Sequence, residues 1–196
     1  LRRNTQMSSK KRRGMQANIT NPIVAPGKAL WKAPKGKWHT LVLLAAVLLA
    51  TAIVHSNSLR NGFVQWDDDA YVYNNKDIRQ LDSQSLGRFF TTYYLRMYQP
   101  VTMISYALDY KIGGLEAKTY HRTNYILHLL NVLLVFCLIL LLTKEKAIAV
   151  ISALFFGIHP LHVESVAWIS ERKDLLYSFF YLASLIAYVL YRWRNN

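Results

Sequence analysis

The sequence predicts an all-α membrane protein, a polytopic helical bundle that crosses the bilayer about four times. Two observations predict this fold. First, apolar residues gather in long runs, such as 41–54 and 129–142, which a water-soluble core does not need. A helix of about 20 residues crosses a hydrocarbon layer roughly 30 Å thick. Second, basic residues stand beside these runs, as in proteins whose orientation is set by positive charge on the cytoplasmic side.

The 1–37 segment carries only basic charges and contributes much of the net charge of +13. In a soluble protein such a balance would suggest a nucleic-acid partner. Here a hydrophobic helix follows the tail directly, so the positive-inside rule already accounts for the charge and no nucleic-acid partner is predicted. The tail is rich in Ser, Asn, Gln, Pro and Gly, and we expect it to be disordered and cytoplasmic.

Four spans are predicted, over about 38–55, 120–143, 147–159 and 175–191. A signal peptide is the alternative for the first, but no small-x-small cleavage pattern follows it, which favours an uncleaved anchor. With the N-terminus inside, the basic turn at 144–146 and the basic end at 192–194 also lie inside. The third span is short, and we expect its end at His159 and Pro160 to be partly buried in protein.

This topology places the 56–119 loop outside, with too few apolar residues for an independent core. Two weakly amphipathic segments, 85–97 and 100–112, suit helices that lie horizontally at the headgroup level. The second segment has a favourable first-turn residue in Pro100 and a helix stop at Gly113 and Gly114.

Three consecutive carboxylates, Asp67, Asp68 and Asp69, follow the first span in this loop. Adjacent carboxylates repel each other, so one of them tends to hold a proton or a cation. Such a group suits a general base or a metal ligand. A solvated acidic turn is the alternative reading.

The second external segment, 160–174, is dense in ionisable groups between two spans. His159, His162 and Glu164 are spaced so that they can share a helical face, which fits metal ligation or ordinary interfacial polarity. Arg172 and Lys173 are natural partners for a phosphate at the membrane surface.

Four polar residues in the second span follow one another at helical spacing: His121, Asn124, His128 and Asn131. They fall on one face, and polar groups in a membrane helix face protein or a wet cavity. We expect this stripe to pack inward, either as interhelical hydrogen-bonding groups or beside a catalytic site.

Three stretches in this order carry a resemblance: FVQWDDDAYVYNN at 63–75, YHRTNYILHLLN at 120–131 and HPLHVESVAWISERKDLL at 159–176. Over about 61–191 the chain resembles the tetratricopeptide-repeat membrane proteins with a GT-C glycosyltransferase domain, related to the transmembrane O-mannosyltransferases. The family's domain has more spans than this, followed by repeats of about 34 residues. The resemblance therefore implies that 38–196 is the N-terminal part of such a domain and that the remainder of the chain is missing.

The resemblance implies a GT-C-like bundle whose active site lies on the external or lumenal side, with a catalytic acid in the first external loop. Such enzymes transfer a sugar from a polyprenyl-phosphate donor to an acceptor hydroxyl with inversion. The family's acidic pair aligns with Asp67 and Asp68, so these are the expected catalytic residues. The sugar is expected to be mannose and the acceptor a protein, with a divalent metal ion left open as a cofactor.

In this reading Arg172 and Lys173 hold the departing lipid phosphate, while His159, His162 and Glu164 orient a substrate or hold an ion. Two other functions compete with it. A non-enzymatic membrane scaffold would tolerate loss of the acidic pair. A transporter would place charges at the bilayer midplane, whereas here they stand at the ends of the spans.

Overall fold

The computed structural model describes residues 36–195, so the basic tail predicted over 1–37 lies, but for its last two positions, outside the described residues. The described chain is built from helices, with one isolated β-bridge between Tyr94 and Met97. Within residues 36–195, three helical stretches are long and apolar enough to cross a membrane: Trp38–Arg60, Ala117–Thr143 and Ile169–Arg194. The predicted all-α membrane fold is thereby confirmed.

The spanning helices are α1 (Lys37–His55), α4 (Ala117–Thr143), α5 (Lys146–Ile158) and α7 (Arg172–Arg194). Helix α5 is too short to cross alone, but after His159 the chain continues as a helical stretch over Pro160–Ala167 at a bend of 51°. That stretch includes α6 (Val163–Ala167). Counted as one broken span, this pair brings the number to four. Pro160 explains the break, because proline cannot donate the next helical hydrogen bond.

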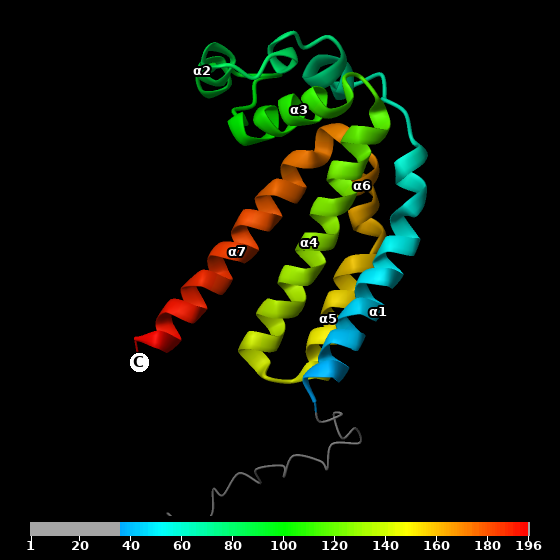
Figure 1. Cartoon of the computed structure of the whole chain (residues 1–196), viewed down its shortest axis with the longest axis vertical. Coiled ribbons are helices and arrows are strands. Elements are labelled where there is room, and N and C mark those ends of the chain that lie inside the picture. The colour runs from blue at the N-terminus through cyan, green and yellow to red at the C-terminus, as the bar shows by residue number, and fades with distance from the viewer. Residues whose placement is uncertain (1–35, 196) are drawn as a thin grey trace, which may run out of the picture. The chain divides into compact units, whose positions relative to one another are not determined.

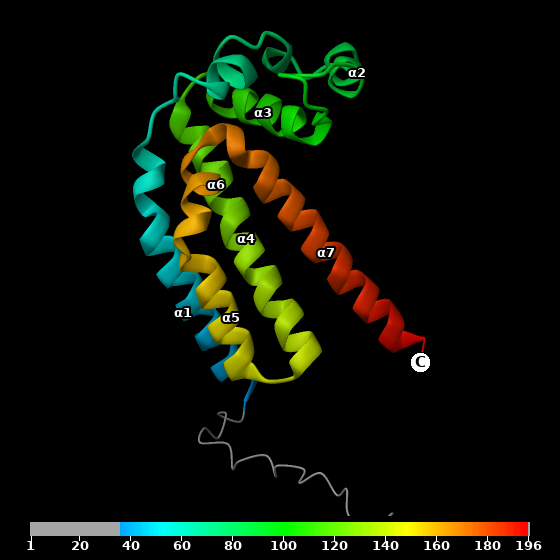
Figure 2. The same cartoon turned by 180° about the vertical axis from the view of Figure 1, so that it is seen from behind.

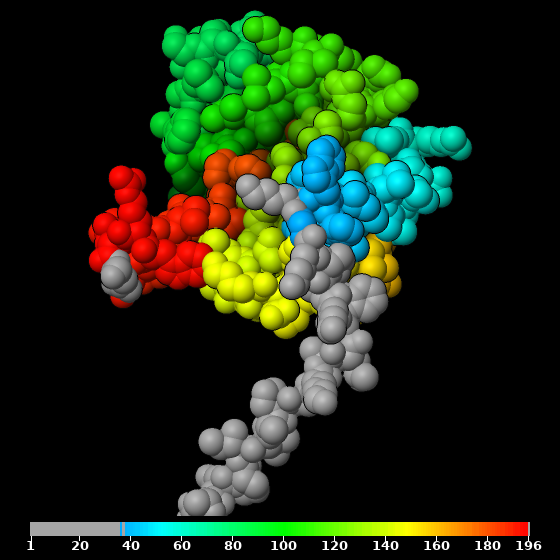
Figure 3. All heavy atoms as spheres, turned by 60° about the horizontal axis from the view of Figure 1, so that its bottom comes forward, coloured from blue at the N-terminus to red at the C-terminus, as the bar shows by residue number. Residues whose placement is uncertain are grey.

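The basic ends of the helices meet at one end of the bundle. The Lys146 ammonium donates to the Gly36 carbonyl at 3.2 Å, so the start of α1 lies beside the α4–α5 turn. The Lys144 ammonium lies 3.5 Å above the Trp193 ring near the end of α7. Figure 3 shows the start of α1, the α4–α5 turn and the end of α7 on the same face. These contacts agree with a topology in which all three lie on one side of the membrane.

At the opposite end, α2 (Ser83–Thr91) and α3 (Pro100–Gly113) lie across the ends of α4 and α7 (Figure 1). Helix α3 begins at Pro100, and its C-cap Gly114 has a φ of 59°, a conformation that glycine adopts without strain. A Cβ at Gly113 would stand 2.2 Å from the Thr119 hydroxyl oxygen, so the close approach of α4 also requires glycine there.

The first amphipathic segment differs from its prediction. A helix was expected over 85–97, but α2 ends at Thr91. Thr91, Thr92 and Tyr93 are β-branched or aromatic and favour helices weakly. The chain instead forms a tight turn closed by two backbone hydrogen bonds between Tyr94 and Met97. Asp82 starts α2 because its carboxylate accepts the Ser85 amide at 2.7 Å, a hydrogen bond that holds the pKa of that carboxyl below its usual value.

Two apolar clusters hold the described chain together. The first cluster lies in the 56–119 loop and is completed by Tyr120 of α4 and Ile169, which agrees with a loop too poor in apolar residues to form a core alone. The second cluster joins α1, α4 and α5 around Val47, Val132 and Ala153. Helix α7 starts beside α4 beneath α3 and diverges from it toward the C-terminus (Figures 1 and 2).

Candidate functional site

The acidic segment lies directly against the segment that precedes α7. The Asp68 side chain is fully buried, and its Oδ1 accepts the Ser170 backbone amide at 3.0 Å and the Ser170 hydroxyl. Its Oδ2 accepts the Val64 amide at 2.9 Å. The two segments, which the sequence predicts on the same side of the membrane, therefore meet. Because three donors already serve Asp68, its carboxylate anchors the loop and is not free to meet a substrate.

Asp67 differs from its neighbour in both exposure and contacts. Its side chain is partly exposed, and it forms no hydrogen bond or ion pair with a described residue. The preceding residue, Trp66, packs edge-on against Trp168, with ring centroids 5.9 Å apart. The two segments thus run alongside each other, with contacts at Trp66 and at Asp68. Between these contacts the Asp67 carboxylate is left available.

The Tyr71 hydroxyl is a buried group near Asp67 in the chain, and its pKa responds to the Asp67 charge. Burial raises the pKa of this hydroxyl, and the nearby Asp67 carboxylate raises it further, with a smaller contribution from Glu171. The Gln99 side chain, just before α3, is its polar neighbour. The pKa of this one hydroxyl thus responds to Asp67, to Gln99 before α3 and to Glu171 before α7.

Arg172 is buried completely and its guanidinium is held by protein on every side. It forms an ion pair with Asp109 of α3 at 2.6 Å and donates to the Asn124 side chain at 2.7 Å. It also donates to the Tyr120 carbonyl at 2.8 Å and to Ser105 at 3.2 Å. All its contacts thus join α3, α4 and α7 to one another, and none leads to an open surface.

Asp109 completes this network from α3. It is 3% exposed, and its Oδ1 accepts the Thr123 hydroxyl at 2.6 Å. Burial raises the pKa of this carboxyl, while the Arg172 guanidinium opposes the rise and favours the charged form. Asp109 and Arg172 each need the other, because either one alone would be an uncompensated charge buried in the protein.

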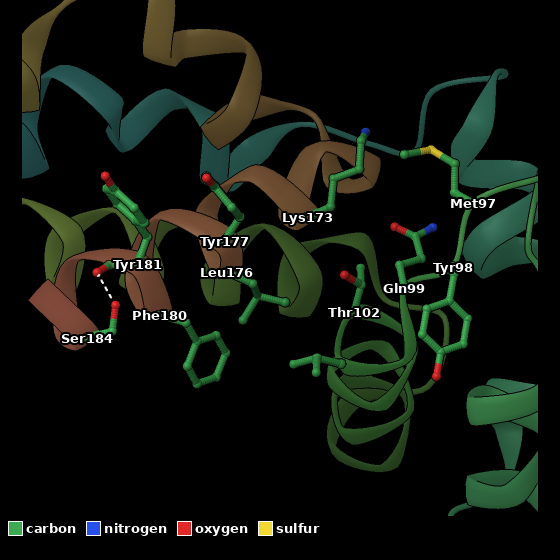
Figure 4. A pocket seen from close by; sticks show the side chains of 11 residues that line it. Met97, Tyr98, Gln99, Thr102, Lys173, Leu176, Tyr177, Phe180, Tyr181 and Ser184 are labelled. Carbon is green, nitrogen blue, oxygen red and sulfur yellow. Dashed lines mark hydrogen bonds between the residues drawn. The ribbon is translucent and has the colours of Figure 1, made fainter.

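Lys173, the next residue, opens onto a groove between α7 and residues 97–102 with a volume of about 490 Å³. In Figure 4, Gln99, Met97 and Lys173 gather toward one end, while Phe180, Tyr181 and Ser184 lie toward the other. We call this the α7 groove. The Lys173 ammonium forms an ion pair with Glu171 at 2.5 Å at the edge of the groove.

The predicted histidines form a separate cluster deeper in the bundle. The His162 ring lies 4.4 Å from the Phe156 ring and 5.7 Å from the His128 ring. His159 accepts the Leu161 amide through Nδ1 at 3.2 Å and starts the helical turn after the bend. None of their hydrogen bonds or ring contacts in residues 36–195 involves Asp67 or Asp68. Glu164 is exposed to solvent and lies near Asp174.

The described side chains do not fit a metal centre. Within residues 36–195, no group of three or more His, Cys, Asp or Glu side chains is placed so that it could hold a metal ion. The histidines that cluster around His128 have no carboxylate among their contacts.

The inward assignment of the polar stripe is confirmed. All four residues are at most 1% exposed. His128 bonds the Gly157 carbonyl at 3.0 Å, and Asn131 donates to the Leu175 carbonyl at 3.0 Å. The stripe therefore joins α4 to α5 and α7 as interhelical hydrogen bonds. Its second member, Asn124, also contacts Arg172 directly.

Four residues of the site were not predicted from the sequence: Ser170, Asp109, Tyr71 and Gln99. Each is a common polar residue whose importance depends on a partner far away in the chain. Ser170 lies 102 residues from Asp68, and Asp109 pairs with a residue of another helix. Asp109 gave no signal of its own, because on the predicted 100–112 helix it shares the polar side with Thr102 and Ser105.

Comparison with known proteins yields several relatives named protein O-mannosyl-transferases. The chain is 31% identical over 150 residues to the human protein O-mannosyl-transferase TMTC3, which covers 71% of this chain and 16% of that protein. It is 30% identical over 156 residues to mouse protein O-mannosyl-transferase TMTC1, which covers 74% of this chain and 16% of that protein. It is also 27% identical over 179 residues to the Drosophila melanogaster protein O-mannosyl-transferase Tmtc3. That match covers 76% of this chain and 19% of the Drosophila protein.

No family model and no solved structure matches the chain. The chain spans less than a fifth of the length of these curated relatives. The matches nevertheless cover about three quarters of the chain itself and agree with the resemblance carried by its three motifs. The chain is therefore related to the transmembrane O-mannosyltransferases, as the sequence predicted.

Proposed function

We propose that this chain is part of a membrane glycosyltransferase of the GT-C type that transfers a sugar, mannose, to a hydroxyl group of a protein. The names of its relatives support the reaction class and the protein acceptor. The donor is a sugar linked to a polyprenyl phosphate. The observation that carries the proposal is the free carboxylate of Asp67, held beside a rigid anchor on a segment that joins the ends of the spans.

In this reaction the acceptor oxygen forms a bond to the anomeric carbon, and the bond from that carbon to the phosphate oxygen breaks. The Asp67 carboxylate accepts the hydroxyl proton as the new bond forms. The polyprenyl phosphate leaves with the electron pair of the broken bond. A nearby carboxylate also stabilises the positive charge that develops on the sugar.

In this proposal the two expected catalytic acids have different roles, which their different contacts support. Asp68 positions the loop through Ser170, and Asp67 acts as the base. The same distinction separates the two expected phosphate ligands: Arg172 supports the site through Asp109, and Lys173 serves the leaving phosphate. His159, His162 and Glu164 remain candidates for contacts to the acceptor or the donor.

The test is transfer of labelled mannose from polyprenyl-phosphate mannose to an acceptor protein, with this chain expressed within its complete reading frame. Asp67→Asn should lower transfer by about 100-fold or more, the usual contribution of a general base. Asp69→Asn is the matched control, since it makes the same charge change two residues away, and it should leave transfer near the parent level. Normal transfer by a folded Asp67→Asn protein would refute the catalytic role and favour the scaffold alternative.

A further inference from the structure

A hollow with a volume of about 360 Å³ opens between α3 and the segment around η3 (Asp77–Arg79). We call it the α3 hollow. It shares no residue with the α7 groove, and the proposed transfer reaction uses none of its side chains. Five residues line it: Arg79, Leu81, Ala107, Tyr110 and Lys111.

The polar groups of the α3 hollow are donors with few partners in the protein. The Lys111 ammonium and the Tyr110 hydroxyl form no hydrogen bond or ion pair with a described residue. The Arg79 guanidinium donates to the Tyr73 carbonyl at 3.2 Å, which leaves most of its N–H groups available. Because an ammonium and a guanidinium can only donate, these groups favour an anionic acceptor.

The protein itself supplies no such anion. Within residues 36–195, no carboxylate lines the α3 hollow. The acid of η3, Asp77, forms an ion pair with Arg88 at 2.8 Å. The acid of α3, Asp109, forms its ion pair with Arg172. The two cations of the hollow therefore keep their charges uncompensated, and the hollow attracts negative charge.

The α3 hollow faces away from the spans. Successive residues of a helix point about 100° apart, so Ala107 and Lys111, each two or more positions from Asp109, lie on the opposite side of α3. Asp109 marks the side of α3 that lies on the spans, because it contacts Arg172. Figures 1 and 2 show α3 between the ends of the spans and the rest of the 56–119 loop. A lipid headgroup at the ends of the spans would lie on the other side of this helix.

An acidic side chain of a protein matches the lining of the α3 hollow. The planar guanidinium of Arg79 fits both oxygens of a carboxylate, Lys111 adds a second charge and Tyr110 adds a hydroxyl donor. Leu81 and Ala107 contribute apolar surface on which the CH₂ groups of Asp or Glu can pack. A free inorganic anion has no such apolar stem.

We propose that the α3 hollow binds an acidic side chain of a protein partner, with the carboxylate at Arg79, Lys111 and Tyr110. The identification of this partner as the acceptor protein rests on the proposed function, but the binding of an acidic segment does not. The acceptor is then held by a group other than its reacting hydroxyl. Acceptors are thereby selected by their charge, since complementary charge favours one partner over another.

Carbodiimide cross-linking tests the α3 hollow without any transfer reaction. The reagent joins a carboxylate to an amine where the two are in contact, so an adduct at Lys111 reports on this hollow and not on the basic 1–37 segment. The 196-residue chain in phosphatidylcholine nanodiscs is incubated with a peptide of alternating serine and glutamate, and adducts are mapped by mass spectrometry. Lys111 should react at lower peptide concentration than Lys118, which is exposed but lies outside the hollow. Equal reaction of the two lysines would overturn the proposal.

Two variants test the other groups that contact the carboxylate. Arg79→Gln and Tyr110→Phe should each raise the peptide concentration that half-saturates the Lys111 adduct about tenfold or more, the usual effect of losing a hydrogen bond to a charged group. Tyr110→Phe removes no hydrogen bond between described residues, so its effect reports on the bound peptide and not on folding. Unchanged half-saturation in both variants would overturn the proposal.

Matched controls lie in the same loop. Arg96→Gln and Tyr93→Phe make the same chemical changes at exposed positions that do not line the hollow. Both should leave half-saturation of the Lys111 adduct unchanged. A rise in the controls equal to that in the test variants would show a general effect of the loop and would overturn the assignment to the hollow.

Competition and lipid adducts separate the possible partners. Neither inorganic phosphate nor a twin peptide with glutamine in place of glutamate should reduce the Lys111 adduct at the concentration of the acidic peptide. Reduction by phosphate would overturn the peptide assignment, and reduction by the twin would overturn the role of the carboxylate. When phosphatidylserine is included in the nanodisc, its headgroup carboxylate should form no adduct with Lys111. Such an adduct would show that the hollow faces the membrane and would overturn the protein partner.

The identification of the partner as the acceptor is tested in the complete protein. Arg79→Gln should lower transfer to an acidic acceptor peptide more than transfer to its glutamine twin, because only the acidic peptide loses a contact. Asp67→Asn should lower transfer to both peptides alike, so failure of the hollow and failure of the proposed function are distinguishable. An equal effect of Arg79→Gln on the two peptides would overturn the acceptor as the partner.

Discussion

The backbone amide of Ser170 donates a 3.0 Å hydrogen bond to the carboxylate of Asp68, which lies 102 residues earlier in the chain. This bond and the Ser170 hydroxyl fix the external loop to the segment that begins α7. Two residues farther on, Arg172 fixes the same segment to α3 and α4. The candidate base Asp67 is therefore carried on a loop that is anchored on both sides.

Asp68→Asn should destabilise the folded chain, whereas Asp67→Asn should not. An asparagine at position 68 must direct its NH₂ group toward either the Val64 amide or the Ser170 donors, which leaves donors unpaired. The expected loss is about 1–3 kcal/mol. At the partly exposed position 67 the change should stay within about 0.5 kcal/mol. Thermal unfolding of both variants in detergent measures this difference, and equal losses would contradict the anchor role of Asp68.

Arg172→Met should destabilise more strongly, because it leaves the Asp109 charge buried and unpaired. Loss of one partner of a buried ion pair costs about 3–5 kcal/mol. The double change Arg172→Met with Asp109→Leu removes both charges and should recover much of that loss. Unfolding of the parent, the two single variants and the double variant forms a complete cycle. A double variant as unstable as the sum of its singles would show that the pair is not coupled.

Gly157→Ala should weaken the contact of α5 with α1. A Cβ at this position would stand 2.3 Å from the Thr51 hydroxyl oxygen and 3.2 Å from a Val132 methyl group. Overpacking of this kind costs about 1–3 kcal/mol. Thr51→Ala should relieve the clash in the same background. Gly62→Ala is the control, since no atom lies within 4 Å of the Cβ it would add.

The predicted orientation can be tested by labelling single cysteines in a Cys137→Ser background. Exposed residues suit this purpose, so we choose Asn57→Cys, Glu145→Cys and Glu164→Cys. A membrane-impermeant thiol reagent should reach positions 57 and 164 from outside, and position 145 only after permeabilisation. Labelling of position 145 in intact cells would reverse the predicted orientation. It would not affect the finding that the start of α1, the α4–α5 turn and the end of α7 lie at one end of the bundle.

The spans and the inward stripe could be predicted from the sequence because lipid imposes simple rules. Hydrocarbon requires long apolar runs, and it cannot satisfy the hydrogen bonds of His128 or Asn131. Both polar side chains accordingly bond carbonyls of other helices. The meeting of the 56–119 and 160–174 segments agrees with the predicted topology, because both extend spans that end on one side. The extent of α2 was less predictable, because local turn geometry competes with weak helical preference at 91–97.

The sequence by itself determined the class of fold, the order of the spans and the segments in which charged groups meet. It presented Asp67 with Asp68, and Arg172 with Lys173, as equivalent neighbours. Only the tertiary structure separated them: Asp68 and Arg172 are buried, while Asp67 and Lys173 reach open space. The reason is geometric. Consecutive residues point in different directions, about 100° apart on a helix. Which direction is buried depends on the elements that pack against them from distant parts of the chain.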